Sequence, residues 1–323
     1  MDMIIRGIRI EAEGIRSFEF VPADGGALAP WQPGAHVQVA LNAVTKRAYS
    51  LCNREQDTDC YRIAVKLESS SRGGSQGMHQ LQVGQRVSID APRNAFALDD
   101  KAQRHVLLAG GIGITPLLSM LHALRGQGGA AVLHYFVRSA GHAAFVPEIG
   151  THGHVHAGLD AQATVAALAD IVARDAADPQ TTYYVCGPEP FMAAVESALQ
   201  AAGVPSERLR SERFGSAPAP KASAAPAAAG GATEAGVFRV RFARCGSEFD
   251  VTPAQTIIEA ARASGLDIPT SCEQGVCGAC LTDVVDGNPE HFDAYLSDAE
   301  RAGGKMILPC VSRCSGRLLV LDR

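Results

Sequence analysis

The sequence has no long uninterrupted apolar stretch and no excess of positive charge. Its most apolar segment, "HVLLAGGIGITPLLSML", is broken by three glycines and a proline before it reaches the length of a membrane-spanning helix. The first residues, "MDMIIRGIRIEAEG", lack the basic start and apolar centre of an export signal. A net charge of −5 gives nucleic acid no basic surface to bind. We therefore expect a cytoplasmic protein with no membrane span and no nucleic-acid partner.

Three of the cysteines lie close together in the sequence. The chain has nine cysteines, and an odd number in a reducing compartment does not favour a disulfide framework. Cys272, Cys277 and Cys280 follow the pattern C-x4-C-x2-C, and Cys310 comes later. This is the plant-type [2Fe–2S] spacing. Zinc more often uses paired C-x2-C knuckles, so we favour an iron–sulfur cluster over zinc or a metal-free loop.

The residues around these cysteines also suit a cluster. Gly275, Gly278 and Ala279 are small enough to let backbone N–H groups approach the sulfides. The later segment "LPCVSRC" offers two cysteines, Cys310 and Cys314. The last ninety residues resemble a plant-type ferredoxin module. We predict Cys310 as the fourth ligand, because it follows an apolar run and matches the ligand position that this resemblance implies.

A chain of 323 residues exceeds the usual size of one domain. Residues 1–100 contain short alternating strands, typical of an antiparallel β-barrel. Residues 101–215 contain near-continuous apolar runs, each followed by a helical pattern, which indicates an α/β domain with a parallel sheet. Residues 216–235 carry no apolar side chain larger than alanine and predict a linker. Residues 236–323 start with a hairpin pattern and predict a small β-rich domain.

Two loops of the second domain suit a dinucleotide. The segment "LLAGGIGITPLLSM" runs from a strand through a glycine-rich turn into a helix, where N–H groups and the helix end can meet a pyrophosphate. Pro116 stands in place of a third glycine. The segment "YVCGPEPFM" should end at the same edge of the sheet and place Cys186 in the wall of a nicotinamide pocket. A tightly packed turn and a buried core thiol are the alternatives.

Two segments of the first domain suit a flavin. In "RAYSLCN", Arg47 and Tyr49 share one face of a strand, and an Arg side chain can bind a phosphate. Ser50 can form a hydrogen bond to the edge of a ring. In "SRGGSQGMH", Gly74 and Ser75 predict a loop whose amides hold a phosphate. Taken singly, each segment is a weak signal: an ordinary strand end is favoured for the first, and a flexible loop is the alternative for the second.

In this order, the motifs resemble the phthalate dioxygenase reductase family, which includes the vanillate O-demethylase reductases. The segments "RGGS", "APRN", "CEQGVCG" and the ending "LLVLDR" carry the closest likeness. The resemblance implies an FMN barrel, an NAD(P)H domain and a β-grasp-like ferredoxin domain in one monomer. It also implies that electrons pass to a separate Rieske-type oxygenase in aromatic catabolism.

The resemblance also implies roles for individual residues. Cys186, Ser50 and Phe214 would be the catalytic residues, where flavin and nicotinamide meet. The strand "AVLHYFV" is followed by Arg138 and Ser139 instead of the acid that usually accepts a ribose hydroxyl, so we predict NADH use with NADPH tolerated. The residues implied to bind flavin or coenzyme are Arg47, Tyr49, Ser50, Gly74, Ser75, Gly111, Thr115, Pro116, Arg138, Ser139, Cys186, Gly187 and Phe214.

Such chemistry resides in cofactors, so no catalytic triad is required, and none is evident in the sequence. The segment "THGHVH" places His152, His154 and His156 at a spacing able to bind a metal, but we favour a polar strand face. Two other functions stay open at this stage. One is an FAD-containing reductase with another protein acceptor, and the other is a non-enzymatic iron–sulfur sensor.

Overall fold

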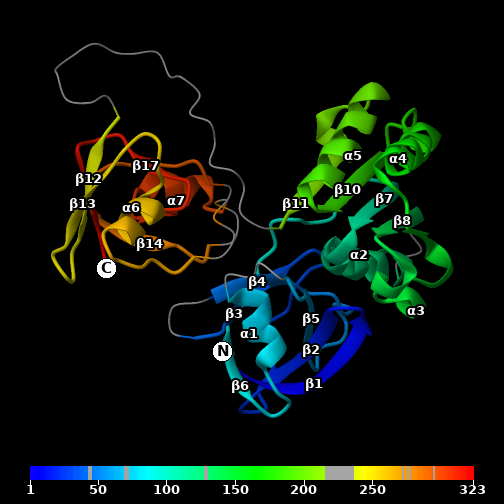
Figure 1. Cartoon of the computed structure of the whole chain (residues 1–323), viewed down its shortest axis with the longest axis horizontal. Helices are drawn as coiled ribbons and strands as arrows, with labels where there is room; N and C mark the ends of the chain where they lie inside the picture. Colours follow the sequence, from blue (N-terminus) through cyan, green and yellow to red (C-terminus); the bar gives the residue numbers. More distant parts are fainter. Residues whose placement is uncertain are drawn as a thin grey trace. The chain divides into compact units, whose positions relative to one another are not determined.

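The computed structural model describes residues 1–42, 46–68, 73–126, 130–214, 236–270, 273, 275, 278–293 and 295–323. The chain divides into two compact units, Met1–Leu41 with Tyr49–Phe214 and Asn42–Ala48 with Gly215–Arg323 (Figure 1). The predicted linker, residues 216–235, lies outside the described residues. Among the described helices, none is long and apolar enough to cross a membrane.

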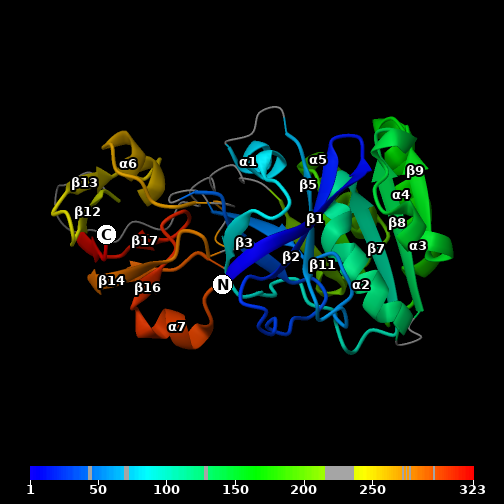
Figure 2. The ribbon, with the colours of Figure 1, turned by 90° about the horizontal axis from the view of Figure 1, so that it is seen from below.

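The N-terminal sheet has six strands, shown in blue and cyan in Figure 2. Their order is β4-β3-β6-β1-β2-β5. Leu51, which follows the end strand β4, forms a bridge with Ile63 of the other end strand, β5, so the sheet curls towards closure as a barrel. The predicted antiparallel barrel is confirmed. The strands are β1 (Asp2–Ala12), β2 (Ile15–Pro22), β3 (His36–Ala40), β4 (Lys46–Ser50), β5 (Tyr61–Lys66) and β6 (Arg86–Ile89).

Alternation of side chains produces the barrel's core. Phe18 and Phe20 of β2 and Ile63 of β5 are fully buried together, as expected for strands with one face inward. The predicted glycine-rich loop differs from expectation, because residues Gly74–Gln80 form the short helix α1. Gly73, with φ 85°, provides the left-handed turn that starts this helix, a conformation that suits glycine.

The second sheet has five parallel strands in the order β11-β10-β7-β8-β9. Helix α2 packs on one face, and α4 with α5 packs on the other (Figure 1). This two-sided cover explains the near-continuous apolar runs. The elements are β7 (Arg104–Gly110), α2 (Ile114–Gly126), β8 (Ala130–Val137), α3 (Val146–Ile149), β9 (Gly153–Ala157), α4 (Ala161–Asp175), β10 (Thr181–Gly187), α5 (Glu189–Ala201) and β11 (Leu209–Arg213).

The strand order reverses between β7 and β10. The chain proceeds from β7 outward to β8 and β9, and then returns to place β10 on the other side of β7. Crevices at such reversals, outside the carboxyl ends of the strands, are where open α/β sheets bind ligands. Both loops predicted to bind the dinucleotide follow these two strands.

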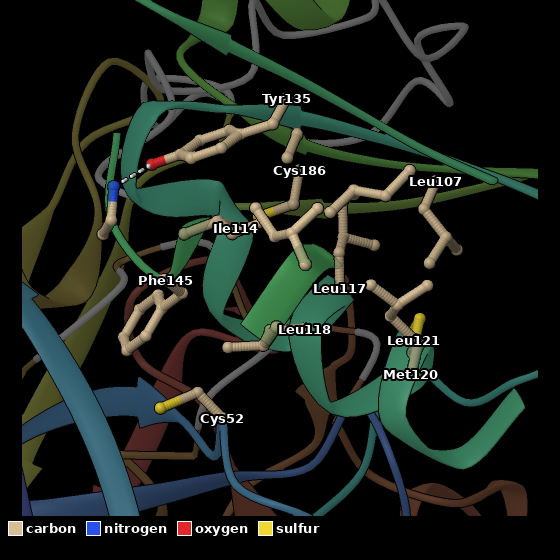
Figure 3. Packing of buried hydrophobic residues seen from close by; sticks show 14 of the residues in the cluster. Cys52, Leu107, Ile114, Leu117, Leu118, Met120, Leu121, Tyr135, Phe145 and Cys186 are labelled. Atoms are coloured by element: carbon tan, nitrogen blue, oxygen red, sulfur yellow. Dashed lines mark hydrogen bonds between the residues drawn. The ribbon is translucent and has the colours of Figure 1, made fainter. Parts of the chain in front are cut away.

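The barrel and the parallel sheet share one hydrophobic core. Cys52 of the barrel belongs to the same buried cluster as Leu118 of α2 and Phe145 before α3 (Figure 3). The Arg62 guanidinium also forms a 2.6 Å ion pair with Glu148. Both sheets therefore belong to a single compact unit.

The C-terminal sheet has the order β13-β12-β18-β14-β16. The predicted hairpin is confirmed, because β12 pairs antiparallel with β13, while β18 runs parallel to β12. Helix α6 starts with a capping box of Thr256 and Glu259 and packs against the sheet. The elements are β12 (Phe238–Phe242), β13 (Glu248–Val251), α6 (Ile257–Ala263), β14 (Thr282–Asp286), β15 (Pro289–Glu290), α7 (Asp298–Gly303), β16 (Met306–Ile307), β17 (Arg313–Cys314) and β18 (Leu318–Leu321).

Candidate functional site

The first loop of the site lies at the carboxyl end of β7. A Cβ atom on Gly113 would lie 2.1 Å from the carbonyl oxygen of Cys186, so this position requires glycine. Thr115 is buried and its Oγ1 donates to the Ile112 carbonyl over 3.1 Å. Pro116 occupies the first turn of α2, which suits its fixed φ. These residues place the start of a helix at the reversal of the strand order, a position that favours anions.

The second loop lies beside the first. A Cβ atom on Gly187 would lie 3.0 Å from the Cα atom of Gly110, so the ends of β10 and β7 are in backbone contact. Cys186 is fully buried. Burial raises the pKa of its thiol well above the usual value, and the nearby Glu212 carboxylate adds to this effect. The thiol is therefore an uncharged group at this edge of the sheet, in contrast to the thiolate of an activated cysteine.

A half-buried carboxyl group also lies at this edge of the sheet. Glu212 of β11 lies opposite Cys186 in the parallel register. It accepts a hydrogen bond over 3.1 Å from the Oγ of Ser50, which lies on β4 of the barrel. Burial raises the pKa of Glu212 to about 7, although the bond from Ser50 acts in the opposite direction. Glu212 therefore gains or loses a proton near neutral pH, as expected for carboxyl groups at functional sites.

The other predicted flavin residues lie on the barrel. Arg47 and Tyr49 are on β4; Arg47 donates to the Lys46 carbonyl over 2.8 Å, and Tyr49 packs against the barrel core. Gly74 and Ser75 begin α1. The Ser75 hydroxyl already accepts a hydrogen bond from the Glu68 amide over 3.0 Å.

Three further predicted residues are exposed at strand ends. Arg138 and Ser139 follow β8, one strand away from β7. Phe214 follows β11 directly and is 41% exposed. Its exposed ring lies two residues beyond Glu212.

The predicted cluster loop is only partly described, because Cys272 and Cys277 lie outside the described residues. Cys280 and Cys310 are described, and both are buried and free of disulfides. They lie in one core together with Cys314, and buried cysteines gathered in one core fit a role as metal ligands. Among the described residues alone, no group of three metal-ligating side chains forms a site.

The glycines of this loop test its fit to a cluster. A Cβ on Gly275 would lie 2.6 Å from Cγ2 of Val311, and one on Gly278 would lie 2.1 Å from the Tyr295 ring. Both glycines have positive φ, which other residues rarely adopt. The backbone is therefore held without side chains at the two positions where the sequence predicts close approach to the sulfides.

Cys314 has partners of its own. Its Sγ accepts from the Gly316 amide at 3.3 Å and donates to the Leu318 carbonyl at 3.6 Å. These contacts are local to the turn after β17. The assignment of Cys310 as the fourth ligand stays a prediction.

Comparisons with known proteins agree with this geometry. The model of the 2Fe-2S iron-sulfur cluster binding domain matches residues 242–315, and that of the dimethylamine monooxygenase subunit DmmA-like N-terminal domain matches residues 90–209. A vanillate O-demethylase oxidoreductase from Pseudomonas sp. (strain HR199 / DSM 7063) is 41% identical over the whole chain and 99% of its own length. The chain belongs to the phthalate dioxygenase reductase family.

Two further matches extend this result. The solved structure of phthalate dioxygenase reductase is 33% identical, with a TM-score of 0.68, and the match covers the whole chain and 98% of that protein. A tetrachlorobenzoquinone reductase from Sphingobium chlorophenolicum is 40% identical, over the whole chain and 98% of its own length.

Membership of the phthalate dioxygenase reductase family confirms the predicted fold, activity and cofactors. The protein is an NAD(P)H-dependent flavin and iron–sulfur oxidoreductase that uses FMN and a [2Fe–2S] cluster. It is the reductase component of an oxygenase system, and electrons pass within it from pyridine nucleotide to the cluster.

The histidine motif forms a polar face, with a partner that the sequence did not reveal. His152 lies before β9, whereas His154 and His156 lie on it. The neighbouring strand β8 contributes His134, whose Nδ1 is 3.1 Å from Nε2 of His156. Burial, followed by the neighbouring histidines, lowers the pKa of His134 to about 3. His134 is therefore neutral at physiological pH.

Proposed function

We propose that this reductase delivers its electrons to a Rieske-type oxygenase. The observation that carries the proposal is a ferredoxin-like unit on the same chain as the nucleotide edge. A pyridine nucleotide yields two electrons together, whereas a Rieske centre takes them one at a time. When bound, FMN takes two electrons from the coenzyme and releases them singly to the [2Fe–2S] cluster.

We propose that each domain binds one cofactor. Residues 1–100 hold FMN, residues 101–215 hold the coenzyme, and residues 236–323 hold the cluster after a linker at 216–235. A cytoplasmic monomer remains a prediction. The shared core of the barrel and the parallel sheet supports this division, because it fixes the flavin site relative to the coenzyme site.

The flavin side of the proposal rests on Ser50. Its hydroxyl lies on the barrel and donates to Glu212 of the parallel sheet. We propose that it also reaches the edge of the flavin ring. Phe214, exposed after β11, would cover the face of the ring. The residues proposed to bind FMN are Arg47, Tyr49, Ser50, Gly74, Ser75 and Phe214.

The coenzyme side rests on the two loops at the reversal of the strand order. Neutral Cys186 provides an uncharged surface for the nicotinamide. Glu212 keeps a proton up to a pH of about 7, which limits negative charge at this edge. The residues proposed to bind the dinucleotide are Gly111, Thr115, Pro116, Arg138, Ser139, Cys186 and Gly187.

The cluster side rests on cysteines. We assign Cys272, Cys277, Cys280 and Cys310 as ligands. The burial of Cys280 and Cys310 and the glycine-only positions Gly275 and Gly278 support this assignment.

The test combines the full-length protein with NADH and a purified Rieske-type oxygenase under anaerobic conditions. We expect bleaching of the oxygenase's Rieske absorbance. A sample cleaved within residues 216–235 should still reduce ferricyanide but no longer reduce the oxygenase. The proposed acceptor would be refuted if the intact protein reduced ferricyanide fully but reduced no Rieske oxygenase encoded near its gene.

A second candidate acceptor is a quinone. The tetrachlorobenzoquinone reductase is almost as similar to this chain as the vanillate relative, at 40% against 41% identity. Steady-state rates with a chlorinated benzoquinone and with the oxygenase decide between them. The physiological acceptor should give the larger kcat/KM.

A further inference from the structure

The end of β8 is the place where coenzyme choice is decided in doubly wound sheets. An acidic residue there accepts the ribose 2′-hydroxyl of NAD, whereas a basic residue accommodates a 2′-phosphate. Here the strand is followed by Arg138 and Ser139, so the local sequence supplies no acid. Within the described part of the chain, no hydrogen bond or ion pair is found for the exposed Arg138 guanidinium.

A carboxylate nevertheless reaches this position from the barrel. Glu13 lies in the turn between β1 and β2, and its backbone amide donates to the Gly141 carbonyl over 2.9 Å. A Cβ atom on Gly141 would lie 3.6 Å from Oε2 of Glu13 and 3.8 Å from Oγ of Ser139. The Glu13 side chain therefore lies over the loop that follows β8.

His142 connects the two polar groups. Its Nδ1 is 2.8 Å from Oγ of Ser139, and its Nε2 is 3.9 Å from Oε2 of Glu13. The Glu13 side chain is 74% exposed and the His142 side chain is 25% exposed, so both can meet a ligand. Ser139, His142 and Glu13 thus form a continuous polar row beside Arg138.

The geometry points to Glu13 as the residue that sets the choice between NADH and NADPH. This inference rests on the proposed coenzyme site. The Glu13 carboxylate accepts a hydrogen bond from a ribose hydroxyl, either directly or through His142, and it repels a 2′-phosphate. Arg138 favours the phosphate, so the two charges oppose each other. NADH is preferred while NADPH is tolerated.

The Glu13 side chain is not needed to hold the loop that follows β8. The contact between the β1–β2 turn and Gly141 is made by backbone atoms. Replacing Glu13 by Gln keeps these atoms and the side-chain shape but removes the charge. Any change in nucleotide choice would therefore report on the charge.

The experiment measures binding of two probes to the full-length protein loaded with its cofactors. The probes are adenosine 5′-monophosphate and adenosine 2′,5′-bisphosphate, and the method is isothermal titration calorimetry. Glu13→Gln should shift the ratio of their dissociation constants about five- to tenfold towards the bisphosphate, since a unit charge acts on a near-dianion at an exposed site. The ratio of kcat/KM for NADPH over NADH should rise by the same factor.

Glu207→Gln is the matched control. Glu207 is exposed and precedes β11, so it lies at the opposite, amino end of the parallel sheet. This variant should leave the ratio unchanged. A ratio for Glu13→Gln within twofold of the wild type would overturn the inference alone. Failure of the wild-type protein to bind either probe or to oxidise either coenzyme would instead overturn the proposed coenzyme site.

Discussion

The Oγ of Ser50 donates a hydrogen bond to Oε2 of Glu212 over 3.1 Å, and this bond joins β4 of the barrel to β11 of the parallel sheet. Glu212 lies beside Cys186 in the sheet register. A hydroxyl, a neutral thiol and a carboxyl group therefore lie together at the carboxyl edge of the parallel sheet.

The first prediction concerns Ser50. Ser50→Ala removes the hydroxyl that donates a hydrogen bond to the Glu212 carboxyl group. We expect flavin reduction by NADH to slow by about tenfold, corresponding to about 1.4 kcal/mol for the lost hydrogen bond. Stopped-flow absorbance at the flavin band measures the rate. Ser88→Ala, an exposed serine of β6, is the control and should react at the wild-type rate.

The second prediction concerns pH and Glu212. Its folded pKa of about 7 is above the usual 4.5, so folding takes up a proton between these values. The free energy of unfolding should therefore fall by about 3 kcal/mol as the pH rises from 4.5 to 7. Urea titrations should show that Glu212→Gln removes this part of the decline. An equal decline in the variant would mean that Glu212 is not protonated in the folded protein.

The third prediction concerns acid and His134. Its folded pKa of about 3 is below the usual 6.5, so stability is complete above pH 6.5 and is lost as the pH falls towards 3. Between pH 6.5 and 5 the loss should be about 2 kcal/mol. His134→Asn should reduce this loss of stability, whereas His152→Gln, at an exposed position, should not. Chemical denaturation at several pH values checks both variants.

The features that could be predicted are those that depend on residues adjacent in the sequence. The loops after β7 and β10, the hairpin of β12 and β13, and the cysteine spacing all follow from local patterns. The start of α1 was expected to be a loop because glycines dominate it, but Gly73 serves as a turn into a helix. Local patterns identify the motifs, but the ends of an element also depend on what it packs against.

The missed residues depend on register between distant strands. Glu212 joins the site because β11 pairs with β10 so that it lies opposite Cys186. His134 meets the histidine motif only through the β8–β9 pairing, and Glu13 reaches Gly141 from the barrel. An acid two residues before Phe214 was the available signal for Glu212, but the sequence could not show that it faced Ser50.

The fourth prediction concerns the fourth cluster ligand. Cys310→Ser should abolish or destabilise the [2Fe–2S] signal, while NADH still bleaches the flavin. Cys314→Ala should leave both signals intact, because its Sγ atom forms hydrogen bonds with the nearby backbone of Gly316 and Leu318. Electron paramagnetic resonance of the dithionite-reduced variants measures the cluster. Loss of the cluster only in the Cys314 variant would reverse the assignment.

One chain is expected to carry electrons from NADH through FMN to its own [2Fe–2S] cluster. The decisive experiment is anaerobic mixing of the purified full-length protein with NADH, followed by absorbance at the flavin and cluster bands. We predict that the flavin band bleaches first and the cluster band follows in the same molecule at a rate independent of protein concentration. A cluster band that stays oxidised while the flavin is fully reduced would rule out this path of electrons.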